Sequence, residues 1–386
     1  MTNHRSARVG AAGLLAAIVL TACGGGATSA PSSGPGESPA APTGGPSSGM
    51  AAPTPPTADV TLQGAGATFP NPLYQVWFEA FNYTYNNIQI DYQSIGSGGG
   101  IKAITQQTVD FGASDAPMKD EELAALPNGS TLLHIPTALG AVVVVYNLPN
   151  VTDLQLDSDN VANIFLGKIT NWNDAAIAAN NPSVTLPDLA VRVVHRSDGS
   201  GTTNAFTTYL DTVSPEWQSK VGKGKEVNWP TGLGAPGNDG VAGSVKGDAN
   251  AGAVGYVELN YATTAGLTSA RLKNANGKFV AGSTEGVTAA ADGAADKFPA
   301  DFRQAPIING AGDGTYPIAS YTYLLVYQDQ TDAVKGQTLV AFLYWALTDG
   351  QATEGGLGYA PLPASIKDIA IAELHKITSG GTPLWP

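Results

Sequence analysis

The stretch VRVVHRSDGSGT at residues 191–202 decides how this chain is expected to fold. It starts as an apolar run typical of a buried strand, passes through a turn rich in glycine and serine, and leads into apolar residues at helical spacing up to residue 210. The same order of strand, glycine-rich turn and helix recurs at residues 60–81 and 88–105. Strands that alternate with helices in this way predict an α/β fold with sheets rich in parallel strands.

Further elements are expected between and after these units. Residues 141–147, 255–259 and 321–327 have the composition of strands, and residues 336–346 that of a late helix. Globular composition starts at Asp59 and leaves a little over 300 residues. That length exceeds what one compact core usually serves, so we expect two lobes.

The N-terminus has the features of an export signal. Arg5 and Arg8 precede an apolar run at residues 9–20, and Cys23 follows as the only cysteine of the chain. An apolar run of about a dozen residues is shorter than the roughly 20 that a spanning helix needs. We therefore expect residues 1–22 to be a lipoprotein signal peptide. Cleavage leaves Cys23 as the N-terminus, carrying lipid such as palmitate and tethering the protein outside the cytoplasm; a buried structural cysteine is the alternative.

The segment after Cys23 has the composition of a spacer. Residues 24–58 consist mainly of Gly, Pro, Ser, Ala and Thr, with Glu37 as their only charge. Such a segment cannot bury enough apolar surface to offset chain entropy, so residues 23–59 are expected to be a disordered linker with lipid at its start. The chain has a net charge of −13, and loss of the signal leaves 17 basic against 32 acidic residues. This balance disfavours nucleic acid as a partner.

The three glycine-rich turns suit an oxyanion. Free N–H groups at a helix N-terminus, together with the helix dipole, attract negative charge, and glycine lets a ligand approach the backbone closely. Hydroxyl groups add donors to these turns, and the candidates are Thr68, Ser97, Ser200 and Thr202. A single glycine-rich turn of this kind commonly has only a structural role, whereas three of them in one chain favour an anion-binding site.

Two kinds of charged residue accompany the turns. Arg196 supplies a guanidinium fork that fits a tetrahedral oxyanion, and Asp198 is placed to hold that fork. Asp115 is different, because an ionised carboxylate repels anions and only accepts hydrogen bonds. Phosphate keeps a proton to donate at neutral pH and sulfate does not, so an acceptor at Asp115 would favour phosphate. On these residues alone, a turn-forming role before Pro117 is an equal alternative for Asp115.

Several motifs together resemble one known family. The sequence contains GAGATFP at residues 64–70, IGSGG at 95–99, VDFGASDAP at 109–117 and RSDGSGT at 196–202, with further matches at residues 229–230, 237–240, 255–258 and 316–318. From residue 60 to the C-terminus these motifs resemble the phosphate-binding protein family of bacterial high-affinity phosphate ABC transporters. The chain departs from the family pattern at His195, where a second arginine is frequent, and at Gly98, where a second serine often follows Ser97.

The resemblance implies a fold and a function. The fold would be the two-lobe, periplasmic-binding-protein-like α/β fold of type II, with a two-strand hinge and the ligand in the cleft between the lobes. Lobe 1 would comprise residues 60–137 plus 317–386, and lobe 2 residues 138–316. The implied function is a lipid-anchored, extracytoplasmic receptor, monomeric and without cofactor or metal, that binds inorganic phosphate and delivers it to membrane permease subunits.

The resemblance also implies the ligand contacts. They are Thr68, Phe69 (through its main chain), Ser97, Asp115, Arg196, Ser200, Gly201 and Thr202, with Asp198 as a supporting residue.

Two other classes of function remain as alternatives. An enzyme such as a phosphatase or serine hydrolase is disfavoured, because neither Ser97 nor Ser200 lies in a Gly-x-Ser-x-Gly elbow and no phosphate-binding Gly-x-x-x-x-Gly-Lys loop exists. His134, His195 and His375 are scattered without the spacing of a metal site, and no catalytic residue is assigned. A surface adhesin or a receptor for sulfate or molybdate is the third class. The carboxylate of Asp115 argues against such anions, since a fully deprotonated ligand has no proton to donate to it.

Overall fold

A computed structural model describes residues 51–385. The expected signal peptide at residues 1–22, the lipidation site Cys23 and the linker up to residue 50 therefore lie outside the described residues. Between residues 51 and 385, no helix combines the length and the apolar character that a membrane crossing needs.

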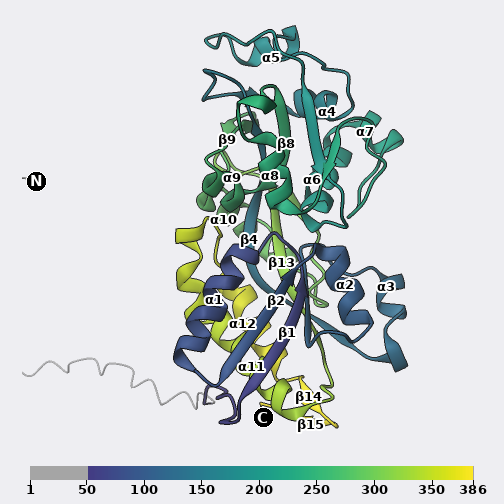
Figure 1. Cartoon of the computed structure of the whole chain (residues 1–386), viewed down its shortest axis with the longest axis vertical. Helices are drawn as coiled ribbons and strands as arrows, with labels where there is room; N and C mark the ends of the chain where they lie inside the picture. Colours follow the sequence, from purple (N-terminus) through teal and green to yellow (C-terminus); the bar gives the residue numbers. More distant parts are fainter. Residues whose placement is uncertain (1–50, 386) are drawn as a thin grey trace, which may run out of the picture. The chain divides into compact units, whose positions relative to one another are not determined.

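One large sheet organises the described chain (Figure 1). β1 runs parallel to β2 and β3 at one end of it, and β6 runs parallel to β7 and β8 at the other. The α/β fold class predicted from the sequence is thus confirmed. In spatial order the strands are β2 (Ile88–Ser94), β1 (Val60–Gly66), β3 (Phe111–Ser114), β13 (Ile318–Tyr327), β4 (Leu132–Tyr146), β8 (Ala253–Glu258), β6 (Arg192–Arg196) and β7 (Leu233–Ala235), with β12 (Ile307–Ile308) beside β13 and β9 (Thr268–Ser269) beside β4.

Helices connect and cover these strands. They are α1 (Asn71–Thr84), α2 (Ser97–Thr105), α3 (Asp120–Ala124), α4 (Ser158–Phe165), α5 (Ala175–Asn180), α6 (Gly201–Val213), α7 (Pro215–Lys220), α8 (Gly237–Val245), α9 (Leu259–Ala265), α10 (Thr284–Asp292), α11 (Ala333–Leu347) and α12 (Ala364–Leu374). Two small sheets complete the fold, one of β5 (Gln155–Leu156), β10 (Arg271–Lys273) and β11 (Phe279–Val280), the other of β14 (Thr378–Ser379) and β15 (Thr382–Pro383).

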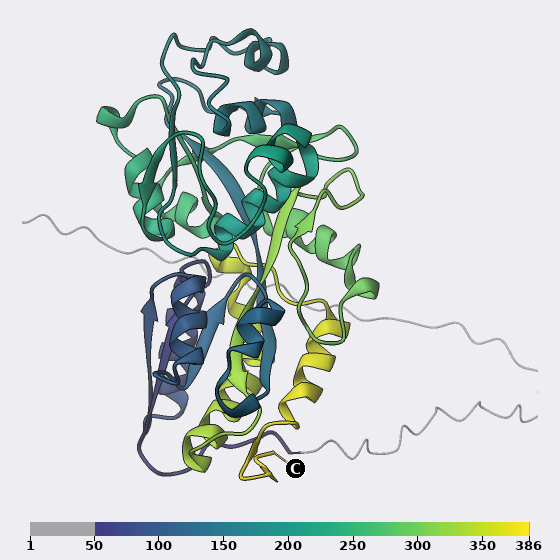
Figure 2. The same ribbon diagram turned by 90° about the vertical axis from the view of Figure 1, so that its right-hand side faces the viewer.

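The strands β4 and β13 join two lobes. Residues 132–141 of β4 pair with β13, whereas residues 142–146 pair with β8, and all 15 residues of β4 are buried. Figures 1 and 2 show α1, α2, α11 and α12 grouped at one end of these strands and α4, α6, α7 and α8 at the other. The sheet thus passes from one lobe to the other through its two central strands. The residue numbers assigned to each lobe stay a prediction.

Local sequence accounts for the helix that follows β1. Leu73, Trp77 and Phe81 recur at helical spacing in α1 and are fully buried, and Pro72 lies in the first turn, where a missing N–H costs little. Phe81 packs against Phe342 of α11 with ring centroids 5.4 Å apart. The apolar face of α1 therefore packs α11 against the lobe that contains β1.

The central strands are longer than the sequence predicts. β4 begins at Leu132 rather than residue 141, and β13 begins at Ile318 rather than residue 321. Pro136 lies within the added part of β4, and proline normally argues against a central strand because it lacks an N–H donor. The structure accommodates it where the pairing of β4 with β13 shifts register, between Thr322 and Tyr323.

Candidate functional site

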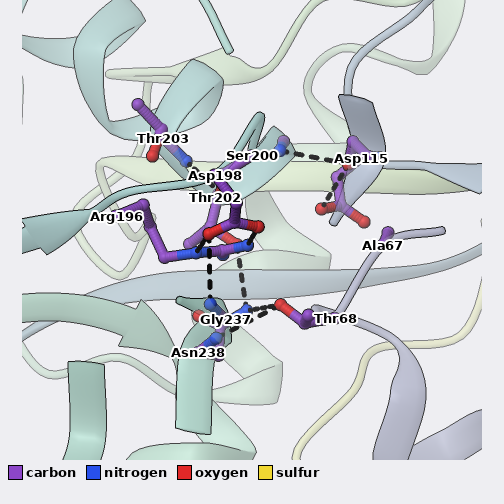
Figure 3. A network of polar contacts seen from close by, with 12 residues as sticks. Ala67, Thr68, Asp115, Arg196, Asp198, Ser200, Thr202, Thr203, Gly237 and Asn238 are labelled. Atoms are coloured by element: carbon purple, nitrogen blue, oxygen red, sulfur yellow. Dashed lines mark hydrogen bonds and ion pairs between the residues drawn. The ribbon is translucent and has the colours of Figure 1, made fainter. Parts of the chain in front are cut away.

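The candidate site lies where four helices begin. The helices α1, α2, α6 and α8 start within a few residues of the ends of β1, β2, β6 and β7. α1 and α2 belong to one lobe, and α6 and α8 belong to the other (Figure 1). Figure 3 shows residues from the turns before α1, α6 and α8, together with Asp115, around one point. N–H groups and dipoles of several helices converge there, which makes the point favourable for negative charge.

The turns before α2 and α6 are in direct contact. The Gly201 N–H donates to the Ser97 hydroxyl at 3.1 Å, and the Gly98 N–H donates to the Gly199 carbonyl at 2.8 Å. A Cβ atom on Gly201 would lie 2.5 Å from the Asp115 carboxylate and 2.7 Å from the Ser97 hydroxyl. Only glycine permits this approach, so the structure shows the two lobes closed on each other at this point.

Arg196 is held rigidly at the end of β6. Its guanidinium is buried and donates through Nε to Asp198 Oδ1 at 2.8 Å and through Nη2 to Asp198 Oδ2 (Figure 3). Its Nη1 lies 3.5 Å from the Thr202 hydroxyl. Burial alone would raise the pKa of Asp198, but the hydrogen bonds and charge of Arg196 lower it below the usual value. Arginine has five N–H donors, so within residues 51–385 two remain for a ligand.

Asp115 lies directly after β3 and is buried, with only 2% of its surface exposed. Its Oδ1 accepts a hydrogen bond from Thr322 at 2.8 Å, and its Oδ2 accepts one from Ser97 at 3.3 Å. Burial raises the pKa of Asp115 to about 7, although Thr322, the charge of Arg196 and Ser97 act in the opposite direction. With this pKa the carboxyl group can be either protonated or ionised near neutral pH, and in its ionised form it can accept a hydrogen bond from a protonated ligand oxygen.

The backbone at residues 67–69 lies beside the site, where the Ala67 N–H already donates to the Ala113 carbonyl at 2.9 Å. The three carbonyl groups of this segment each accept a hydrogen bond from a tyrosine hydroxyl. Tyr92 donates to Ala67 O at 2.8 Å, Tyr261 to Thr68 O at 2.6 Å and Tyr359 to Phe69 O at 2.7 Å. Among the hydrogen bonds of residues 51–385, the N–H groups of Thr68 and Phe69 have no acceptor. Both are available to an anion.

The remaining predicted residues lie at the start of α6. Ser200 caps this helix, and its hydroxyl accepts the Thr203 N–H at 3.0 Å. Thr202 is fully buried, with its hydroxyl toward Arg196. The structure thus places all eight predicted ligand residues and Asp198 in the turns around one closed site.

Sequence reasoning missed several polar residues of this site. Asn238, at the start of α8, is fully buried and donates to the hydroxyls of Thr68 and Thr202. Asn238 lies in the motif at residues 237–240 that already belongs to the family resemblance, and this motif is the signal that would have pointed to it. Other missed residues are Thr322, Tyr92, Tyr261 and Tyr359, which reach the site from distant parts of the chain.

The three histidines of the described chain have other environments. His195 stacks on Trp229 with ring centroids 4.7 Å apart, and His375 stacks on Trp385 at 3.9 Å. His134 Nε2 accepts the Met118 N–H at 3.1 Å. Among residues 51–385, no group of three or more His, Cys, Asp or Glu side chains is placed to hold a metal ion.

Comparison with known sequences and structures supports one family. Residues 51–350 match the model of the PBP superfamily domain. The chain is 43% identical over 319 residues to "Phosphate-binding protein PstS" of Xylella fastidiosa, covering 81% of this chain and 85% of that protein. It is 39% identical over 340 residues to "Phosphate-binding protein PstS" of Methanocaldococcus jannaschii, covering 82% and 86%.

Solved structures share the fold. A phosphate-binding protein from Stenotrophomonas maltophilia superposes with a TM-score of 0.65 at 22% identity, covering 84% of this chain and 96% of the other. An ABC-type phosphate transport receptor from Vibrio cholerae has a TM-score of 0.50 at 19% identity, covering 78% and 100%. These likenesses confirm the two-lobe, type II periplasmic-binding-protein fold. The chain therefore belongs to the PstS family of phosphate-binding proteins, which are binding proteins rather than enzymes.

Proposed function

We propose that this protein is a receptor that binds inorganic phosphate between its two lobes. The proposed contacts are the backbone N–H of Phe69, the side chains of Thr68, Ser97, Asp115, Arg196, Ser200 and Thr202, and the backbone of Gly201, whose N–H would be shared between the ligand and the Ser97 hydroxyl. Asp198 orients Arg196. The observation that carries this proposal is the meeting of a buried guanidinium, four helix N-termini and a buried carboxyl group in one closed site.

The carboxyl group explains why phosphate is the proposed anion. Arg196 and the backbone donors would suit any tetrahedral oxyanion. Asp115 instead accepts a hydrogen bond when ionised, so it pairs with a ligand oxygen that carries a proton. Sulfate has no such proton at neutral pH, and its charge would face the carboxylate without a compensating bond.

The proposal extends to transport. We propose that the closed, loaded receptor delivers phosphate to the permease subunits of an ABC transporter in the cell membrane. Membership of the PstS family supports this role. Lobe 1 is proposed to comprise residues 60–137 and 317–386, and lobe 2 residues 138–316. Two observations near these boundaries support the division: β4 passes from β13 to β8 after residue 141, and β13 begins at Ile318. One chain supplies every proposed ligand residue, which supports a monomer.

We further propose that Cys23 becomes the N-terminus and carries the lipid that anchors the protein outside the cytoplasm. The apolar run at residues 9–20 and the lone cysteine support this processing. One acyl chain gives only marginal membrane binding, so more than one is expected. Cys23→Ser should prevent processing and release the protein from membranes. Mass spectrometry that finds an unmodified Cys23 in an unprocessed chain from the native host would refute this proposal.

Titration with anions tests the ligand. Trp229 lies in the lobe that contains Arg196 and stacks on His195, the residue next to Arg196, so closure should change its fluorescence. Phosphate and arsenate are expected to change the intrinsic fluorescence saturably, whereas sulfate at the same ionic strength should not. A chromogenic phosphate ester should release no product. No response to phosphate, or catalytic release from the ester, would contradict the proposed function.

A further inference from the structure

Asn238 connects three elements of the site and is fully buried. Its side-chain Nδ2 lies 2.8 Å from the Thr68 hydroxyl and 3.1 Å from the Thr202 hydroxyl (Figure 3). Its backbone N–H also faces Thr68 Oγ1, at 3.3 Å. Thr68 follows β1 in one lobe, and Thr202 lies in α6 of the other. One amide group therefore spans the junction between the lobes.

The orientation of this amide follows from its third contact. The remaining side-chain atom of Asn238 lies 3.0 Å from the backbone nitrogen of Glu258. A backbone N–H only donates, so the atom that faces it must be the carbonyl oxygen Oδ1. The NH₂ group consequently faces the two hydroxyls, and this assignment needs no knowledge of hydrogen positions.

The surroundings of the two hydroxyls then decide where their protons point. A hydroxyl has one proton and two lone pairs. Thr68 Oγ1 faces the two nitrogens of Asn238, and Thr202 Oγ1 faces Asn238 Nδ2 and Arg196 Nη1, 3.5 Å away. All of these nitrogens are donors without a lone pair to offer. Neither hydroxyl can donate its proton to these nitrogens. Both hydroxyl protons are therefore available to a ligand.

We propose that Asn238 is a positioning residue that commits the hydroxyl protons of Thr68 and Thr202 to unprotonated oxygens of the bound oxyanion. This inference rests on the proposed function. It also sets the orientation of the ligand, because oxygens beside Thr68 and Thr202 must then be acceptors. A singly protonated tetrahedral anion is left with one place for its proton, which is the carboxylate of Asp115.

A double-mutant cycle tests the role of Asn238. Phosphate affinity is measured by calorimetry for the wild type and for Asn238→Ala, each also combined with Thr68→Val and with Thr202→Val. Asn238→Ala is expected to weaken binding by about 10-fold to 100-fold, because the two hydroxyls become free to turn away. Each valine removes one of these hydroxyls, so the loss should shrink severalfold in either background. An equal loss in all three backgrounds would overturn the proposal.

Asn238→Ala leaves the buried Glu258 N–H without an acceptor and could fail to fold for that reason. A second variant tests the proposal in that case. Asn238→Asp keeps the acceptor for that N–H, but its carboxylate accepts the two hydroxyl protons. It should bind phosphate more than about 100-fold more weakly than the wild type. Asp239→Asn changes the charge of the next, exposed residue by one unit and should alter affinity less than about threefold. Asn238→Asp within threefold of the wild type would overturn the proposal.

The outcome separates this inference from the proposed function. Wild-type protein that gives no heat with phosphate would refute the proposed function itself. Wild-type binding with no coupling between Asn238 and the two threonines would refute only the role of Asn238.

Discussion

Replacing Gly201 by alanine should prevent full closure while leaving each lobe intact. The new Cβ atom would lie 2.5 Å from Asp115 and 2.7 Å from Ser97, so the lobes must stop about 1 Å short of the closed position. The bond from Gly201 N–H to Ser97, now 3.1 Å, would then be lost. A lost neutral bond costs about 0.5–1.5 kcal/mol and overpacking about 1–3 kcal/mol. Together these weaken phosphate binding by roughly 2–4 kcal/mol, or about 30-fold to 1,000-fold.

The assay combines calorimetry with thermal unfolding of the ligand-free protein. Asp115 and Ser97 belong to the other lobe, so the unfolding temperature of Gly201→Ala without ligand should change by less than about 2 °C. Gly243→Ala in α8 is the matched control, since its Cβ meets nothing within 4 Å and alanine favours a helix. Its affinity should stay within about twofold of the wild type. Phosphate affinity of Gly201→Ala within threefold of the wild type would show that the closed contact is not part of the bound state.

Three further predictions concern the groups around the ligand. Arg196→Ala should weaken phosphate binding more than Thr68→Ala in calorimetry, because a charge-assisted bond contributes about 1.5–3 kcal/mol against about 0.5–1.5 for a neutral one; equal losses would contradict the assigned roles. Tyr359→Phe frees the Phe69 carbonyl and should weaken binding by about 3-fold to 10-fold, whereas Tyr83→Phe, on the exposed surface, should have no effect. Stability of the ligand-free protein should depend on pH: burial raises the pKa of Asp115 from 3.8 to about 7 in the folded state, so folding takes up a proton between these values. The contribution of Asp115 to stability should therefore be fully present below about pH 4 and be lost as the pH rises through about 7, so the unfolding temperature of the wild type should fall over this range relative to that of Asp115→Asn; parallel curves for the two proteins would contradict the raised pKa.

Short-range patterns in the sequence account for most of the site. The turns with Thr68, Ser97 and Arg196 each lie between a strand-like and a helix-like run, so local periodicity places them at helix N-termini. Local periodicity does not reveal Asn238, because the strand before it, β7, has only three residues and exposes Leu233. Without alternation, no strand is predicted there.

Other features depend on contacts between distant residues. Thr322 binds the Asp115 carboxylate across 207 positions of the sequence, and Tyr359 binds Phe69 across 290. No local pattern contains such pairings. The first part of β4 is not predicted from the sequence because it contains Pro136, and proline argues against a central strand. The register shift that accommodates this proline depends on the pairing of β4 with β13, which no local pattern shows.

Sulfate affinity tests the central claim most directly. Phosphate and sulfate are titrated into the wild type and into Asp115→Asn at one pH near neutral and one ionic strength. The wild type should bind phosphate and reject sulfate by several kcal/mol, because a buried carboxylate faces an anion with no proton to donate. Asp115→Asn removes that charge and supplies an NH₂ donor, so the gap should shrink, chiefly through tighter sulfate binding. Wild-type protein that binds sulfate as tightly as phosphate, or a ratio that the substitution leaves unchanged, would contradict the proposed basis of specificity.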